Sequence, residues 1–444
     1  MHVEASACTV QLSGICLHFH EIIRTFACQF NKMTMKLRFR LNSLWLSMAA
    51  FLLVACGHHG QHRNEQALTA DSLFRVERDS LLAELEQDGT AASAADTIRI
   101  HYAKGLQVAY QDDGSIRVTI SNPDAEESRA TTLLLNAPDA SDHPRAICLN
   151  TPIRGAICMT ALQLSNFTAL GLEDRIVGIN SQRHLFNQRI RQQLADGTTA
   201  TIGKEGSFDV EKVLAAQPDF IFVSASKRGG FEQLKDCGIP LIPHHGYKET
   251  DPLGQAEWLK LVGLLTGQTR RANAVFADIE KKYNTLRDEV ARYTSGNHEG
   301  HTSRPTVLSG KQIRDGWYIM GGRSYIACIF ADAGADYIIH NEETGGQTLD
   351  FETVYAQGIN TEFWQIDGSF GGEFSYDRLA AEDPRYADLA AFKNHRIIYC
   401  DLSQTPYREL SPVEPHYLLA DFVKAFHPEI LPHYEPHYYR LLQP

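Results

Sequence analysis

The longest regular pattern in the chain is a helical run from Gln268 to Tyr293. Its apolar residues recur at steps of three and four, which predicts one apolar stripe along a helix. The residues of this stripe are Ala272, Val275, Phe276, Ile279, Tyr283, Leu286 and Val290. Such a helix would span roughly 39 Å, about the width of a small domain. Periodicity alone also fits an ordinary surface helix, so the flanking patterns must decide its role.

Before this helix, strand-like and helix-like segments alternate along the chain. Predicted strands cover residues 146–150, 175–180, 219–224 and 239–245. Predicted helices cover residues 159–171, 209–216 and 231–238, and a lead-in helix covers 255–266. This alternation predicts parallel strands joined by right-handed helical crossovers.

The same alternation restarts after the long helix. Predicted strands cover residues 306–310, 362–367 and 396–401, and predicted helices cover 324–334, 350–357 and 412–426. We therefore predict an α/β protein with two α/β lobes joined by a single long backbone helix. Residues 97–122 alternate as strands around an Asp-Asp-Gly turn, and another strand follows at 131–136, which predicts a small β-rich extension on the first lobe.

The N-terminal region has the features of a targeting segment. Residues 35–40 are basic, residues 44–54 are apolar, and small residues precede Cys56. This pattern predicts a lipoprotein signal peptide, with Cys56 carrying the lipid that tethers the protein to a membrane. The alternative is an ordinary signal peptide cleaved near Ala55. The predicted organisation is an upstream extension not belonging to the true gene product (1–34), signal peptide (35–55), linker (56–96), β-rich element (97–144), first lobe (145–251), lead-in and backbone helices (252–294) and second lobe (305–444).

Composition narrows the classes of function. The 444 residues allow two or three domains, and 43% hydrophobic residues is ordinary for a globular protein. The net charge of −12 argues against a nucleic-acid partner. No CxxC pair occurs, and we expect the cysteines beyond Cys56 to be buried small side chains, with any pairing among them left open. No P-loop, GxSxG or HExxH sequence occurs, so no enzyme class is indicated.

Two short segments in the two halves of the chain resemble each other. Residues 208–216 and 349–357 each place an aspartate before a helix and a glutamate two residues later, Glu211 and Glu352. Helix capping and the helix dipole explain an acid at each place. They do not explain why both halves carry the same one.

An ordered series of segments resembles a known family. The segments are LGLEDRIVGI (170–179), IGKEGSFDVEKVLAAQPDFIFV (202–223), LKDCGIPLI (234–242), EWLKLVGLLTGQTRRANAVFADIEKKYNTL (257–286) and GGRSYIACIFADAGADYI (321–338). Together they resemble the helical-backbone substrate-binding proteins of ABC importers, which carry ferric siderophores, haem or cobalamin.

The resemblance implies a monomeric receptor on the periplasmic face of a bacterial membrane. It implies capture of an iron complex between the lobes and delivery to an ABC permease with its ATPase, without a resident cofactor or catalysis. Cobalamin as ligand is the alternative, and a chelatase-like enzyme using His184 and Glu373 is the less favoured one. In this family an acid on each lobe docks onto basic permease residues, and the matching residues are Glu211 and Glu352.

Ligands of open α/β sheets bind beyond the carboxyl ends of the strands. Charged candidates for an anionic ligand are Arg154, Arg183, Lys204 and Arg323. Aromatic candidates for stacking are Trp317, Tyr318 and Tyr325. Candidates for an axial haem ligand are Met159, His184 and Tyr318. A bare metal ion would need converging ligands from His184, His244, His245, Asp367 and Glu373, and no close spacing joins these residues.

Overall fold

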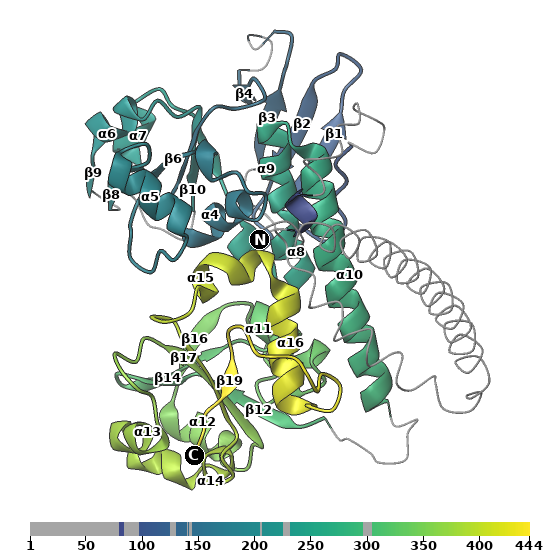
Figure 1. The fold of residues 1–444 in the computed structure, drawn as a ribbon, viewed down its shortest axis with the longest axis vertical. Helices are drawn as coiled ribbons and strands as arrows, with labels where there is room; N and C mark the ends of the chain where they lie inside the picture. Colours follow the sequence, from purple (N-terminus) through teal and green to yellow (C-terminus); the bar gives the residue numbers. More distant parts are fainter. Residues whose placement is uncertain are drawn as a thin grey trace, which may run out of the picture. The chain divides into compact units, whose positions relative to one another are not determined.

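The computed structural model describes residues 80–83, 97–124, 130–139, 141, 144–204, 207–224, 231–295 and 304–444. The chain divides into two compact units, 1–66 and 67–444, and every described residue belongs to the second. The predicted upstream extension, the signal peptide and Cys56 lie outside the described residues. The structure is drawn in Figure 1.

The predicted backbone helix is α10 (Thr269–Thr294), and it is 26 residues long. All seven apolar residues of the predicted stripe are buried in it. α10 packs against α9 (Leu259–Thr266) on the side of the first lobe and against α16 (Pro415–Phe426) in the second lobe (Figure 1). The stripe therefore contacts both lobes, which confirms the predicted fold of two α/β lobes joined by one helix.

The first lobe is built on a five-stranded parallel sheet in the order β11-β10-β5-β6-β7. Its strands are β5 (Ala156–Cys158), β6 (Ile176–Ile179), β7 (Ala200–Thr201), β10 (Phe220–Val223) and β11 (Leu241–Pro243). Its helices are α4 (Ala161–Thr168), α5 (Gln188–Asp196), α6 (Val210–Ala215) and α7 (Glu232–Lys235). The short hairpin β8 (Gly203–Lys204) and β9 (Ser207–Phe208) follows β7.

The strand predicted at 146–150 was assigned to the wrong sheet. It is β4 (Ile147–Leu149), and it pairs with β3 (Thr131–Leu135) of the N-terminal extension. The first lobe starts instead with β5. Both runs are short and apolar, and such a pattern does not reveal which sheet a strand joins.

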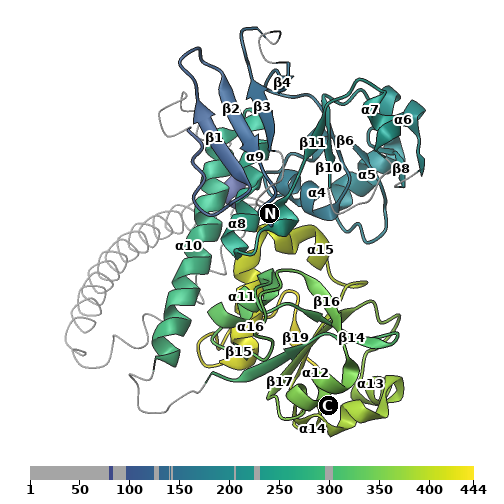
Figure 2. The same ribbon diagram turned by 180° about the vertical axis from the view of Figure 1, so that it is seen from behind.

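The N-terminal sheet also contains β1 (Leu106–Tyr110) and β2 (Ile116–Ile120), which form the predicted hairpin. This sheet lies beside α9 in both views (Figure 2). Two buried carboxylates anchor the segment before it. Glu257 of α8 (Pro252–Glu257) accepts the backbone N–H groups of residues 101–103, and Glu249 accepts those of residues 104 and 105.

The second lobe has a five-stranded sheet in the order β15-β12-β17-β18-β19, in which only β19 is antiparallel. The strands are β12 (Thr306–Ser309), β15 (Asp336–Tyr337), β17 (Phe363–Gly368), β18 (Ile397–Asp401) and β19 (Arg440–Leu441). Its helices are α11 (Tyr325–Asp332), α12 (Phe351–Gly358), α13 (Tyr376–Glu382), α14 (Ala390–Lys393), α15 (Tyr407–Leu410) and α16. A second antiparallel sheet holds β13 (Lys311–Ile313), β14 (Gly316–Met320) and β16 (Gly346–Leu349).

The cysteines of the described part are free thiols, namely Cys148, Cys158, Cys237, Cys328 and Cys400. Cys158 and Cys400 are buried, whereas the other three are half-buried. No helix among the described residues has both the length and the apolar character needed to cross a membrane.

Candidate functional site

The lobes meet where the segments after β6 and β18 approach each other. Glu409 of α15, only 2% exposed, accepts the backbone N–H of Phe186 at 2.6 Å and that of Asn187 at 2.9 Å. Each carboxylate oxygen takes one of these two donors. Burial raises the pKa of Glu409, and the two amide hydrogen bonds oppose the rise. A charged side chain of the second lobe is thus fixed to the backbone of the first.

A second contact joins the lobes near the end of β11. Asp124 of the N-terminal extension accepts hydrogen bonds from Lys248 Nζ at 2.7 Å and from Thr344 Oγ1 at 3.2 Å. Lys248 belongs to the first lobe and Thr344 to the second. β6 and β11 lie on opposite sides of β10 and β5 in the sheet, so the two contacts flank the central strand ends. We call the region between them the lobe junction.

Tyr325 lies at this junction, as the first residue of α11. It interacts electrostatically with Asp251, which caps α8, and with Tyr407, the first residue of α15. Burial raises the pKa of Tyr325 well above its ordinary value. Its hydroxyl is buried and has no hydrogen-bond partner among the described residues. An unpaired buried hydroxyl costs free energy, so a ligand atom that reaches this hydroxyl would gain a hydrogen bond.

Positive charge gathers beside the Glu409 contact. Arg183 is exposed, and its Nε donates to His184 Nε2 at 3.1 Å, just before the amides that Glu409 binds. Arg408 is the neighbour of Glu409 and is also exposed. Desolvation raises the pKa of Asp367 at the end of β17, and Arg408 partly opposes that rise. Within the described part of the chain, Arg408 makes no ion pair or hydrogen bond.

Arg408 was not among the residues singled out from the sequence. It lies on α15, and nothing in the local sequence pattern separates it from other surface arginines. Only the pairing of Glu409 with the first lobe shows that its neighbour lies at the junction.

Both histidines after β11 are buried, and neither shows the setting of a metal ligand. His244 packs on Trp258 at a centroid distance of 4.4 Å, and its Nε2 is 3.1 Å from Asn166 Nδ2. Burial lowers the pKa of His244 to about 3. Burial also lowers the pKa of His245. The described residues contain no group of three or more His, Cys, Asp or Glu side chains placed to hold a metal ion.

Three of the predicted ligand residues are buried or lie at the amino end of the sheet, so they do not offer their side chains to the junction. Trp317 is fully buried, donates from Nε1 to Ser309 O at 2.9 Å, and packs in the core of the second lobe. Met159 is 2% exposed within an apolar cluster of the first lobe, so its sulfur is not open to a haem iron. Arg154 precedes β5 and pairs with Asp219, which precedes β10, so both lie at the amino end of the sheet.

The remaining predicted residues lie on exposed surface. Lys204 is exposed in β8, and Tyr318 is 42% exposed on β14. Arg323 forms an exposed ion pair with Glu342 at 2.6 Å. The structure brings Arg183, His184 and Tyr325 to the junction. Arg323 lies beside it, because its backbone N–H donates to Glu343 O at 3.0 Å, next to Thr344.

A separate hollow lies at the carboxyl end of β18. Its volume is about 690 Å³, and its walls include Glu373, Phe374, Tyr399, Asp401 and Arg440. Arg440 Nε donates to Tyr399 Oη at 3.1 Å, so the guanidinium contacts another residue of the same wall. We treat this hollow as distinct from the lobe junction.

The two predicted docking acids occupy equivalent helix positions. Asp209 caps α6 by accepting Lys212 N at 3.1 Å, and Asp350 caps α12 by accepting Thr353 N at 2.9 Å. Glu211 and Glu352 are each the second residue of their helix, and both are exposed. The helices lead into β10 and β17. The two similar sequence segments therefore occupy equivalent positions in the two lobes.

Comparisons with known proteins agree with this architecture. A family model described as periplasmic binding protein matches residues 157–403. An uncharacterized lipoprotein of Methanocaldococcus jannaschii is 22% identical over 367 residues, covering 77% of this chain and 84% of that protein.

A solved structure of low sequence identity has a similar fold. A periplasmic binding protein from Veillonella parvula has a TM-score of 0.51 at 15% identity, covering 70% of this chain and 98% of that one. A periplasmic heme binding protein from Pseudomonas aeruginosa has a TM-score of 0.49 at 20% identity, covering 62% of this chain and 93% of that one. Because the family model spans more than half of the chain, the chain belongs to the periplasmic binding protein family, with a helical-backbone architecture.

Proposed function

We propose that the protein captures an iron complex, a ferric siderophore or haem, at the lobe junction and delivers it to an ABC importer. The observation that carries this proposal is the buried hydroxyl of Tyr325, which lacks a partner among the described residues. Arg183 and Arg408 add positive charge at the same junction, and His184 lies beside Arg183. Ferric siderophores and haem carry carboxylate or other oxygen donors, which suit a phenol and guanidinium groups.

Cobalamin is the alternative ligand, and the structure has fewer features that would bind it. A corrin ring needs aromatic walls, and Trp317, which we expected to supply one, is fully buried. The other described tryptophans, Trp258 and Trp364, are buried as well. We therefore favour the iron complex.

Delivery would require docking on a permease, and we assign that role to Glu211 and Glu352. Both are exposed acids at helix N-termini, one on each lobe, and exposed charges of this kind mainly set orientation and association rate. A lipid on Cys56 would hold the protein at the membrane where the permease resides. We expect the charge reversals E211K and E352K together to leave ligand affinity unchanged and to abolish uptake. If the double variant instead loses its ligand, the two acids are misassigned.

Ligand binding can be tested by titrating the protein from Gln61 onward with haemin, a ferric siderophore or cyanocobalamin. Because the described tryptophans are buried, quenching of their emission would report energy transfer to an absorbing ligand. The proposal expects saturable quenching by haemin or the siderophore. Saturation by cyanocobalamin alone would favour the alternative ligand. No response to any of the three would reject the receptor function.

A further inference from the structure

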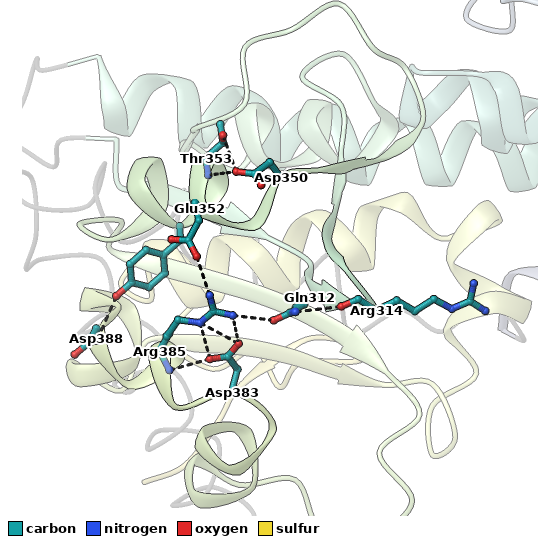
Figure 3. A network of polar contacts seen from close by, with 9 residues as sticks. Gln312, Arg314, Asp350, Glu352, Thr353, Asp383, Arg385 and Asp388 are labelled. Atoms are coloured by element: carbon teal, nitrogen blue, oxygen red, sulfur yellow. Dashed lines mark hydrogen bonds and ion pairs between the residues drawn. The ribbon is translucent and has the colours of Figure 1, made fainter.

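The two docking acids differ in their surroundings, although their helices are alike. The carboxylate of Glu211 makes no hydrogen bond or ion pair with any described residue. Glu352 Oε1 accepts a hydrogen bond from Arg385 Nη1 at 2.9 Å (Figure 3). In the second lobe Glu352 is therefore bound by an arginine of the same lobe, whereas Glu211 in the first lobe has no such partner among the described residues.

Arg385 is itself fixed by Asp383. Arg385 Nε lies 3.0 Å from Asp383 Oδ1, and Nη2 lies 2.6 Å from Oδ2 (Figure 3). The backbone N–H of Arg385 also donates to Asp383 Oδ1 at 3.0 Å. Asp383 is 9% exposed and caps the short 3-10 helix Pro384–Asp388. Such a two-pronged pairing restricts the guanidinium in both position and plane.

Phe351 supplies the remaining support. The guanidinium carbon of Arg385 lies 3.5 Å from the centroid of the Phe351 ring, which is 5% exposed. A cation over an aromatic face at this distance is attracted by the ring. The equivalent residue of the first lobe is Val210, which has no ring. Stacking of this kind is thus possible beside Glu352 and not beside Glu211.

Glu352 keeps the capacity to bind a partner. Its side chain is 71% exposed, and Oε2 has no donor within the described part of the chain. The charges of Asp383, Arg385 and Glu352 sum to −1, so Arg385 does not cancel the negative charge of the site. A side chain held before binding loses less conformational entropy when a partner engages it.

We infer that Arg385 is a positioning residue that holds Glu352 for a basic group of the permease, so that the second-lobe contact is preorganised and the first-lobe contact is not. This inference rests on the proposed docking role of Glu352. It adds an asymmetry to that role, because only one of the two acids is oriented before the permease is met.

The test measures docking of the ligand-loaded protein on its ABC permease, reconstituted with the ATPase in nanodiscs. R385M removes the guanidinium and keeps a long side chain over Phe351. We expect its dissociation constant to rise about two- to tenfold, the range for releasing one long side chain that binding must order again. In an E352Q background the same substitution should add no further loss, because Arg385 acts through Glu352.

The chain offers a matched control in R396M. Arg396 also forms an exposed ion pair, with Glu362 at 3.6 Å, and lies over an aromatic ring, Phe363, at 5.1 Å. R396M should dock like the wild type. Crystals of R385M should show Glu352 in more than one rotamer, a readout that needs no permease.

Distinct results separate this inference from the docking role itself. If E352Q docks like the wild type while ligand binding persists, the docking role of Glu352 fails, and the inference fails with it. If E352Q weakens docking but R385M does not, or if R385M weakens it equally in the E352Q background, the positioning role alone is overturned. Stronger docking by R385M would show that Arg385 competes with the permease.

Discussion

The Glu409 contact offers the sharpest test of how the lobes are joined. Its carboxylate binds two backbone amides of the first lobe, at 2.6 and 2.9 Å, and only 2% of the residue is exposed. E409Q keeps one acceptor oxygen and places an amide nitrogen against the other N–H donor. E409A removes both acceptors and leaves the amides of Phe186 and Asn187 without their partner.

The size of the effect follows from the number of bonds lost. A hydrogen bond to a charged group contributes about 1.5–3 kcal/mol. Phe186 and Asn187 are half-buried, so water can partly replace Glu409, and the lower figure applies. We expect E409Q to reduce the free energy of unfolding by about 1.5 kcal/mol and E409A by about 3 kcal/mol.

Urea denaturation followed by circular dichroism measures both losses, with m-values checked for a change in cooperativity. E373Q is the control, because Glu373 is exposed and its carboxylate makes no hydrogen bond or ion pair with the described residues. It should stay within about 0.5 kcal/mol of the wild type. The reasoning is refuted if E409A is as stable as E373Q.

Two further predictions concern groups at or beside the junction. Burial sets the pKa of His244 at about 3, against about 6.5 in the unfolded chain, so the unfolded state takes up the proton first as the pH falls. This protonation lowers the free energy of unfolding by about 2 kcal/mol between about pH 7.5 and about pH 5. In urea denaturation, H244F should lack that part of the loss. An equal loss in both proteins would show that His244 does not cause it. Y325F should bind the ligand about tenfold more weakly by titration, while its thermal stability stays equal or rises because an unpaired buried hydroxyl is gone. Unchanged affinity would exclude the Tyr325 hydroxyl from the site. Y110F on the N-terminal sheet is the control for affinity, because the Tyr110 hydroxyl accepts a hydrogen bond from Ile98 N and lies outside the junction.

The sequence predicted the parts of the fold that depend on local periodicity. The stripe of α10 repeats over seven apolar positions, and every one is buried. Helices α6 and α12 were equally predictable, because Asp209 and Asp350 are capping residues with a local signature. Strand order was harder, since the run at 146–150 resembles any short buried strand and only pairing with β3 assigns it.

The residues of the site were harder to predict from the sequence than the fold, because they are brought together by tertiary packing. Trp317 followed a predicted strand end and looked available, yet Phe351, Trp364 and Tyr386 cover it from distant parts of the chain. Arg154 was placed at the wrong edge of the sheet because β5 begins two residues after it. Arg408 is significant only through the contact of its neighbour across the lobes. Such facts arise from tertiary packing, which local patterns do not encode.

A metal complex bound between the lobes can be located by anomalous diffraction at the absorption edge of the metal. Crystals would be grown with the ligand that saturates in titration, and the position of the metal read from the anomalous difference map. The account predicts one peak at the lobe junction, bordered by Tyr325 on one lobe and by the Arg183–His184 segment on the other. A peak in the hollow near Asp401 and Arg440, or no peak with a bound ligand, would contradict it.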